Sequence, residues 1–142
     1  MQKGMKNIEL KQMRDEALYN VYLESLSHGS FTSLNELAEY SRKQPAPQFF
    51  IDSRTISLTI GMIEQRISLI NLNDMSRRKA WQLYDNYVRW KKENPDSTLS
   101  RERICEILVE EPAPEFYVHA DTARKIIQRV MKQRRAQIKY QY

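Results

Sequence analysis

The sequence predicts an all-α protein built from two tandem three-helix modules, and three observations lead to that fold class. Apolar residues recur at helical intervals through most of the 142 residues. Capping residues and prolines divide this pattern into short helices. The segment Pro-Ala-Pro-Gln-Phe-Phe-Ile at 45–51 returns as Pro-Ala-Pro-Glu-Phe-Tyr-Val at 112–118, which indicates an internal duplication.

The duplication extends upstream of the repeated segment. Ser33 aligns with Ser100 at the same displacement of 67 residues, whereas Tyr22 matches Tyr87 at a displacement of 65. The second copy therefore carries two extra residues near 94–96, where we expect a loop. The predicted organisation is an N-terminal extension at 1–12, copy 1 at 13–67, copy 2 at 76–134 and a basic C-terminal tail at 135–142.

The first helix of each copy is predicted at 13–27 and at about 76–92. His28-Gly29-Ser30 ends the former, and Asp74 or Ser76 can cap the latter. The residues expected to face inward are Met13, Ala17, Leu18, Val21, Tyr22 and Leu26 in copy 1, and Ala80, Leu83, Tyr84, Tyr87 and Val88 in copy 2.

A short second helix and a third helix follow in each copy. Ser33 and Glu36 form a capping-box pattern, and Pro45 ends the second helix. Its counterpart is expected at 100–110, with Ile104, Cys105, Ile107 and Leu108 facing inward. The third helices are begun by Asp52 or Ser53 and by His119 or Asp121. Their predicted inward residues are Ile56, Ile60, Ile63 and Ile67, then Ala123, Ile127 and Val130.

The repeated Pro-Ala-Pro segment must run extended, because proline fixes φ and lacks an amide donor. The apolar residues after it are expected to fill the gap between the three helices of each copy. These residues are Phe49, Phe50 and Ile51, with Phe116, Tyr117 and Val118. A two-stranded pairing between the two copies of the segment remains open.

Composition and motifs exclude several classes of protein. The chain has one Cys and a net charge of +5, and its apolar residues are too often interrupted by charge for a membrane span. We therefore expect a soluble, cytoplasmic protein without disulfides or structural zinc. His28 and His119 lie at helix ends, Cys105 lies on an inward stripe, and no catalytic motif occurs. We expect no enzyme, no cofactor and no metal site.

Cationic side chains gather on the predicted third helix of copy 2 and beyond it. Lys125, Arg129 and Lys132 recur at intervals of four and three, so they share one face that could meet phosphates, with Gln128 or Arg124 available for a base edge. Copy 1 is expected to show Arg54, Ser57, Leu58, Gly61 and Gln65 outward. The end of copy 2 adds Arg134, and the tail adds Arg135 and Lys139 together with Tyr140 and Tyr142, whose rings could stack on bases.

Three short helices, the last with a capped start and polar or basic residues outward, resemble the tri-helical helix-turn-helix group of DNA-binding modules, here duplicated in tandem. The resemblance implies a nucleic-acid partner, namely duplex DNA. The connection between the second and third helices is about eight residues, longer than the three or four of a helix-turn-helix. The expected contact residues are Arg124, Lys125, Gln128, Arg129, Lys132, Arg134, Arg135, Arg54 and Ser57. Intramolecular ion pairs that cover Lys125 and Arg129 would count against this hypothesis.

A second hypothesis is an all-helical adaptor or a virion or assembly component that binds protein or associates with itself. Trp81 and Trp90 support it, because residues nine apart on one amphipathic helix cannot both occupy the centre of its buried stripe. The Asn-, Lys- and Ser-rich composition is similar to that of phage and mobile-element proteins.

Overall fold

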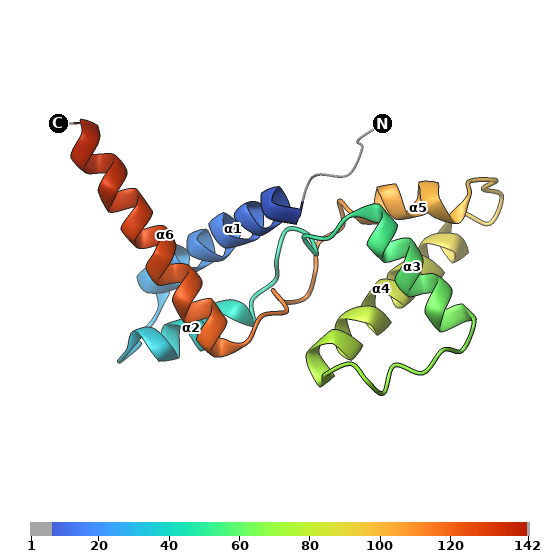
Figure 1. The fold of residues 1–142 in the computed structure, drawn as a ribbon, viewed down its shortest axis with the longest axis horizontal. Helices are drawn as coiled ribbons and strands as arrows, with labels where there is room; N and C mark the ends of the chain where they lie inside the picture. Colours follow the sequence, from blue (N-terminus) through green and yellow to red (C-terminus); the bar gives the residue numbers. More distant parts are fainter. Residues whose placement is uncertain (1–6, 142) are drawn as a thin grey trace. The chain divides into compact units, whose positions relative to one another are not determined.

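The computed structural model describes residues 7–141, with side chains described to residue 138. This part of the chain is all-helical, as predicted, and its six helices are shown in Figure 1. They are α1 (Asn7–His28), α2 (Leu34–Arg42), α3 (Ser53–Glu64), α4 (Asp74–Glu93), α5 (Arg101–Leu108) and α6 (Ala120–Gln141). None of the described helices is both long enough and apolar enough to cross a bilayer.

Side-chain caps set most of the helix starts. The Ser33 and Ser100 hydroxyls and the Asp52 carboxylate each accept a hydrogen bond from a backbone amide of the first turn, as the sequence predicts. The cap of α4 is Asn73, and neither Asp74 nor Ser76, the two expected candidates, caps this helix. The Glu36 carboxylate reaches back to Thr32, the residue before the Ser33 cap. The Thr32 amide and hydroxyl both donate to this carboxylate, at 3.2 and 2.5 Å. These bonds lower the pKa of Glu36.

Helices extend into both predicted terminal segments. α1 begins at Asn7 instead of Met13, since Leu10 continues the apolar stripe by one turn and is 4% exposed. The predicted tail at 135–142 forms the last turns of α6 as far as Gln141. The side chains of Lys139, Tyr140 and Tyr142 lie outside the described residues.

The described helices form two compact units, and each unit combines both sequence copies. One unit contains Gln48–Glu111 with α3, α4 and α5, and is called the continuous unit. The other contains Ile8–Pro47 and the chain from Pro112 onward, with α1, α2 and α6, and is called the split unit. The third helices are therefore exchanged: α6 of copy 2 packs on α2, and α3 of copy 1 packs on α4 and α5 (Figure 1). The ranges 13–67 and 76–134 describe sequence copies and do not coincide with the compact units.

The Pro-Ala-Pro segments explain why a third helix does not fold back onto its own first two helices. Prolines at both ends of each segment keep the chain extended, so a tight turn after the second helix cannot form. Within the split unit, Ala46 and Ala113 exchange two backbone hydrogen bonds of 2.9 Å, which form a single antiparallel bridge. The pairing left open by the sequence therefore exists, at one residue pair. Phe50 and Tyr117, equivalent residues, both have a positive φ, of 58° and 53°.

The core of each unit largely follows the predicted stripes. Phe49, Phe116, Tyr117 and Val118 are buried as expected. Four predicted inward residues are exposed instead, because each lies at the edge of its stripe or beyond the helix end: Leu26, Ile67, Val88 and Ile107. The remaining buried apolar residues include Leu18, Tyr22, Leu37, Ile56, Ile60, Leu83, Tyr87, Ile104, Cys105, Leu108, Ala123, Ile127 and Val130.

Candidate nucleic-acid interface

α6 is an amphipathic helix with a narrow apolar stripe and a broad cationic remainder. Ala123, Ile126, Ile127 and Val130 are each no more than 2% exposed and anchor the helix in the split unit. The 22 residues of α6 carry seven Lys and Arg side chains and one Asp, a formal charge of +6. In contrast, α3 carries one Arg and one Glu. The cationic character therefore belongs to the split unit.

Four polar side chains form an exposed row on α6, which we call the α6 cationic face. Lys125, Gln128, Lys132 and Arg135 are all exposed and follow one another at intervals of three, four and three residues. Such intervals place side chains along one side of a helix. Among the described residues, the ion pairs of α6 engage three other guanidinium groups, those of Arg124, Arg129 and Arg134. The row thus agrees with the predicted orientation of Lys125, Gln128 and Lys132.

Arg129 faces α1 and pairs with Asp15. The Asp15 side chain is 12% exposed and also lies 3.0 Å from the Arg14 guanidinium, so a nearly buried carboxylate is shared by two cations. Arg129 itself stays 54% exposed. Arg129 is therefore exposed, as predicted, but part of its charge is neutralised by Asp15 of α1. Lys125 is not covered in this way.

Arg134 and Arg124 are also engaged within the split unit. Arg134 pairs with Glu16 and lies over the Tyr19 ring, with its guanidinium carbon 4.9 Å from the ring centroid. Arg124 donates to the Asn35 side chain at 3.3 Å and lies 3.7 Å from Asp121. These contacts orient the N- and C-terminal parts of α6 on α2 and α1. Asp15 and Glu16 were not among the predicted site residues, because a pair of carboxylates on a helix is usually interpreted as solvated, and Glu16 is indeed exposed whereas Asp15 is buried.

The two site residues predicted on α3 differ in exposure. Arg54 is exposed, as predicted. Ser57 was expected to face outward, but it is 7% exposed and its hydroxyl accepts a hydrogen bond of 3.2 Å from Arg101 of α5. Gly61 is buried as well, because the Arg101 guanidinium lies 3.4 Å from the position that a Cβ would occupy. Arg101 thus covers the side of α3 that corresponds to the exposed Gln128 of α6.

Equivalent positions in the two units carry opposite chemistry. In the third helix, Lys125 and Arg129 of α6 correspond to Leu58 and Met62 of α3, which are 61% and 37% exposed. In the first helix, Asp15 corresponds to the buried Ala80.

The second ionic pair of the split unit is replaced in the same way. Glu16 and Arg134 correspond to Trp81 and Ile67, which are 50% and 47% exposed. The split unit therefore presents ions where the continuous unit presents apolar side chains.

The second and third helices of the split unit are not joined as in a helix-turn-helix. α2 packs on α6, but the chain between them passes through the whole of the continuous unit. The long connection noted in the sequence is the crossing segment between the units. The resemblance to a helix-turn-helix module is therefore limited to three short helices and a cationic third helix.

No cluster of three or more potential metal ligands occurs among the described residues. Cys105 is buried, and this burial raises the pKa of its thiol to about 11. A thiol in this state is a poor nucleophile.

The chain matches no protein-family model, no curated protein and no solved structure in the comparisons made. Its function is therefore inferred from its own residues.

Proposed function

We propose that this protein binds nucleic acid through the α6 cationic face of the split unit. The observation that carries the proposal is the exposed row of Lys125, Gln128, Lys132 and Arg135 on a helix of charge +6. Cations in a row along a rigid helix neutralise phosphates and release counterions, which supplies most of the affinity of non-specific binding. Gln128, within this row, can donate to and accept from a base edge.

Arg129 and Arg134 extend this surface. Their carboxylate partners on α1 hold both guanidinium groups in place, and both side chains keep 43% or more of their surface exposed. A phosphate that approaches α6 can therefore share these guanidinium groups with Asp15 and Glu16. Duplex DNA is the proposed partner, with α6 as the helix that enters a groove.

The test is a salt series of equilibrium binding to a duplex by the full-length chain. The variant Lys125→Ala with Lys132→Ala should weaken binding and reduce the slope of log K against log salt by about 2, since each phosphate contact contributes about 0.9. The matched control removes two lysines from α4 of the continuous unit, Lys91→Ala with Lys92→Ala, and should leave the slope unchanged. Equal slopes for all three proteins, or no binding at low salt, would refute the proposal.

A second candidate function, protein binding, has one specific observation in its favour. Leu58, Met62, Ile67 and Trp81 are all exposed on the continuous unit, and their counterparts on the split unit are charged. Exposed apolar side chains mark an interaction surface where they form one contiguous patch. Sedimentation over a range of concentrations tests self-association. The variant Leu58→Ser with Met62→Ser should abolish any association of the wild-type chain.

A further inference from the structure

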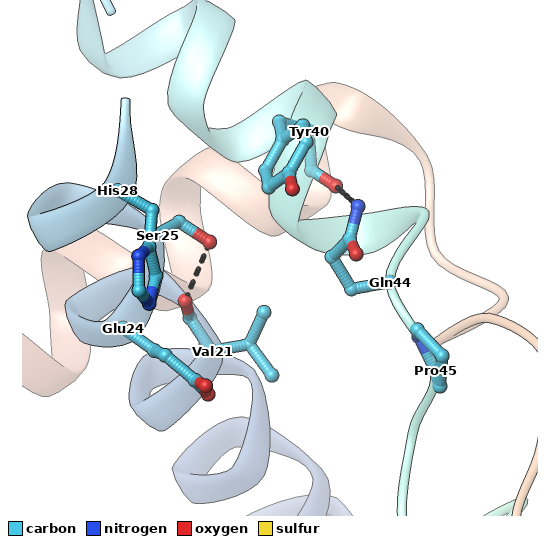
Figure 2. Close-up of a pocket in the computed structure, with 7 residues that line it drawn as sticks. All are labelled: Val21, Glu24, Ser25, His28, Tyr40, Gln44 and Pro45. Atoms are coloured by element: carbon cyan, nitrogen blue, oxygen red, sulfur yellow. Dashed lines mark hydrogen bonds between the residues drawn. The ribbon is translucent and has the colours of Figure 1, made fainter. Parts of the chain in front are cut away.

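A pocket of about 270 Å³ lies between α1 and the end of α2 in the split unit (Figure 2). Figure 2 shows His28 and Ser25 of α1 on one side of the opening, with Tyr40 and Gln44 on the other. All of its lining residues lie between Val21 and Pro45, so the pocket belongs entirely to the split unit.

The internal duplication indicates what size of group this pocket accepts. Ser25, one of the lining residues, occupies the position of Trp90 in copy 2, because the first helices align at a displacement of 65 residues. Trp90 is half-buried in the continuous unit, whereas Ser25 is 5% exposed. The pocket therefore opens at the position where the other copy carries an indole. A planar bicyclic ring is the matching occupant.

The pocket walls carry more hydrogen-bonding groups than an indole needs. The Gln44 amide nitrogen donates to the Tyr40 carbonyl at 3.2 Å, which leaves its side-chain oxygen as an acceptor. The Ser25 hydroxyl donates to the Val21 carbonyl at 2.7 Å and can still accept. The Glu24 carboxylate adds an acceptor, and His28 adds ring nitrogens that donate or accept according to the tautomer. An indole offers one donor, whereas a nucleobase edge offers several donors and acceptors.

An aromatic side chain stands at the rim. Tyr40 is 44% exposed, and its ring is supported by Phe31 at a centroid distance of 5.2 Å. Half-exposed aromatic rings are the platforms on which unpaired bases stack. The same unit carries the α6 cationic face, which supplies phosphate contacts.

We propose that this pocket binds one unpaired nucleobase of a nucleic acid that the α6 cationic face holds by its phosphates. This inference rests on the nucleic-acid binding proposed above and adds a preference for unpaired over fully paired strands. A base inside a duplex is stacked and cannot enter a pocket without leaving the stack.

The experiment compares binding of a short single-stranded DNA and of the duplex it forms with its complement. In the variant Ser25→Trp, the residue of copy 2 fills the pocket. This variant should bind the single strand about tenfold more weakly, in line with the loss of one stacked base, and should bind the duplex within twofold of wild type. The matched control Leu23→Trp adds the same side chain at an exposed position of α1 outside the pocket and should change neither affinity. Tyr40→Ala, a surface change, should reproduce the selective loss if Ser25→Trp does not fold.

The outcomes separate the two proposals. Unchanged single-strand affinity in Ser25→Trp and Tyr40→Ala would overturn the proposal that the pocket binds a base. Duplex binding that depends on Lys125 and Lys132 would still support the proposed function. Absence of binding to either DNA by the wild-type chain would overturn both. Titration with free nucleosides should shift the NMR signals of Ser25 and Gln44. A shift with a tryptophan amide but with no nucleoside would overturn the proposal in favour of a protein side chain.

Discussion

Replacement of the Asp15–Arg129 ion pair by its counterparts from the other unit, Ala and Met, tests whether α6 packs on α1. Arg129→Met leaves a carboxylate that is 12% exposed with Arg14 as its remaining partner. The expected loss is about 1.5 kcal/mol, at the low end for a hydrogen bond to a charged group, because Arg129 is half-solvated. Asp15→Ala leaves two guanidinium groups near each other in water and should cost about 1 kcal/mol.

The double variant should be close to wild type in stability. Replacing both partners of an ion pair by apolar residues of suitable shape often leaves the free energy of unfolding unchanged, whereas removing one partner lowers it. The expected coupling energy is therefore about 2.5 kcal/mol, the sum of the two single losses, which is well above the roughly 0.3–0.5 kcal/mol within which the effects of distant sites add.

Urea unfolding followed by two probes gives the measurement. Both tryptophans, Trp81 and Trp90, belong to the continuous unit, so their fluorescence follows that unit, whereas far-UV circular dichroism follows all helices. The midpoint shift should appear in circular dichroism. Additive effects of Asp15→Ala and Arg129→Met would refute the placement of α6 against α1.

Three further predictions concern single residues. Ser41 is fully buried, its hydroxyl has no hydrogen-bond partner within the described chain, and copy 2 has Leu108 at this position. Ser41→Ala should therefore stabilise the protein by about 1 kcal/mol in urea titrations. A loss of stability would show that the hydroxyl forms a hydrogen bond. The Arg42 guanidinium, with a second cation beside it, lowers the pKa of Glu39 from 4.5 to about 2. The ionised Glu39 therefore stabilises the fold above pH 4.5, and this stabilisation disappears as the pH falls toward 2. Glu39→Gln should flatten the dependence of the unfolding free energy on pH in this range, by less than about 1 kcal/mol because the pair is exposed. Identical pH dependences of the two proteins would contradict this. Burial raises the pKa of Cys105 to about 11, so the native thiol should resist alkylation at pH 8 and react at once in urea; rapid native labelling would contradict its buried state.

Local features of the fold could be predicted from the sequence because they depend on near neighbours. Ser33, Asp52 and Ser100 cap helices where their spacing to the first turn requires it. Lys125 and Lys132 are exposed because the helical period places them opposite Ile127. These inferences need only the residues of one helix.

The composition of the units could not be predicted, because both copies carry similar apolar stripes. The stripe of a third helix therefore matches the first two helices of either copy. The choice depends on the extended Pro-Ala-Pro segments and on the pairing of Ala46 with Ala113, a contact between residues far apart in sequence. The burial of Ser57 followed from the same cause, since Arg101 of copy 2 covers α3 only after the exchange.

The surroundings of Arg129 in the candidate site also depend on residues far away in the sequence. The helical period places it on the edge between the buried stripe and the solvent face, where a neighbouring helix decides its surroundings. Asp15 of copy 1 meets this residue of copy 2 only because α6 belongs to the split unit. Lys125 and Lys132 lie farther from this edge, and their exposure follows from the helical period alone.

The exchange of third helices is tested most directly by methyl NOE spectroscopy of the full-length chain. The account predicts cross-peaks from the methyl groups of Ile126 and Ile127 in α6 to leucines of α1 and α2, such as Leu18 and Leu37. Cross-peaks from these isoleucines to Leu83 of α4 or to Leu108 of α5 would contradict it, since they would place α6 on the first two helices of its own copy.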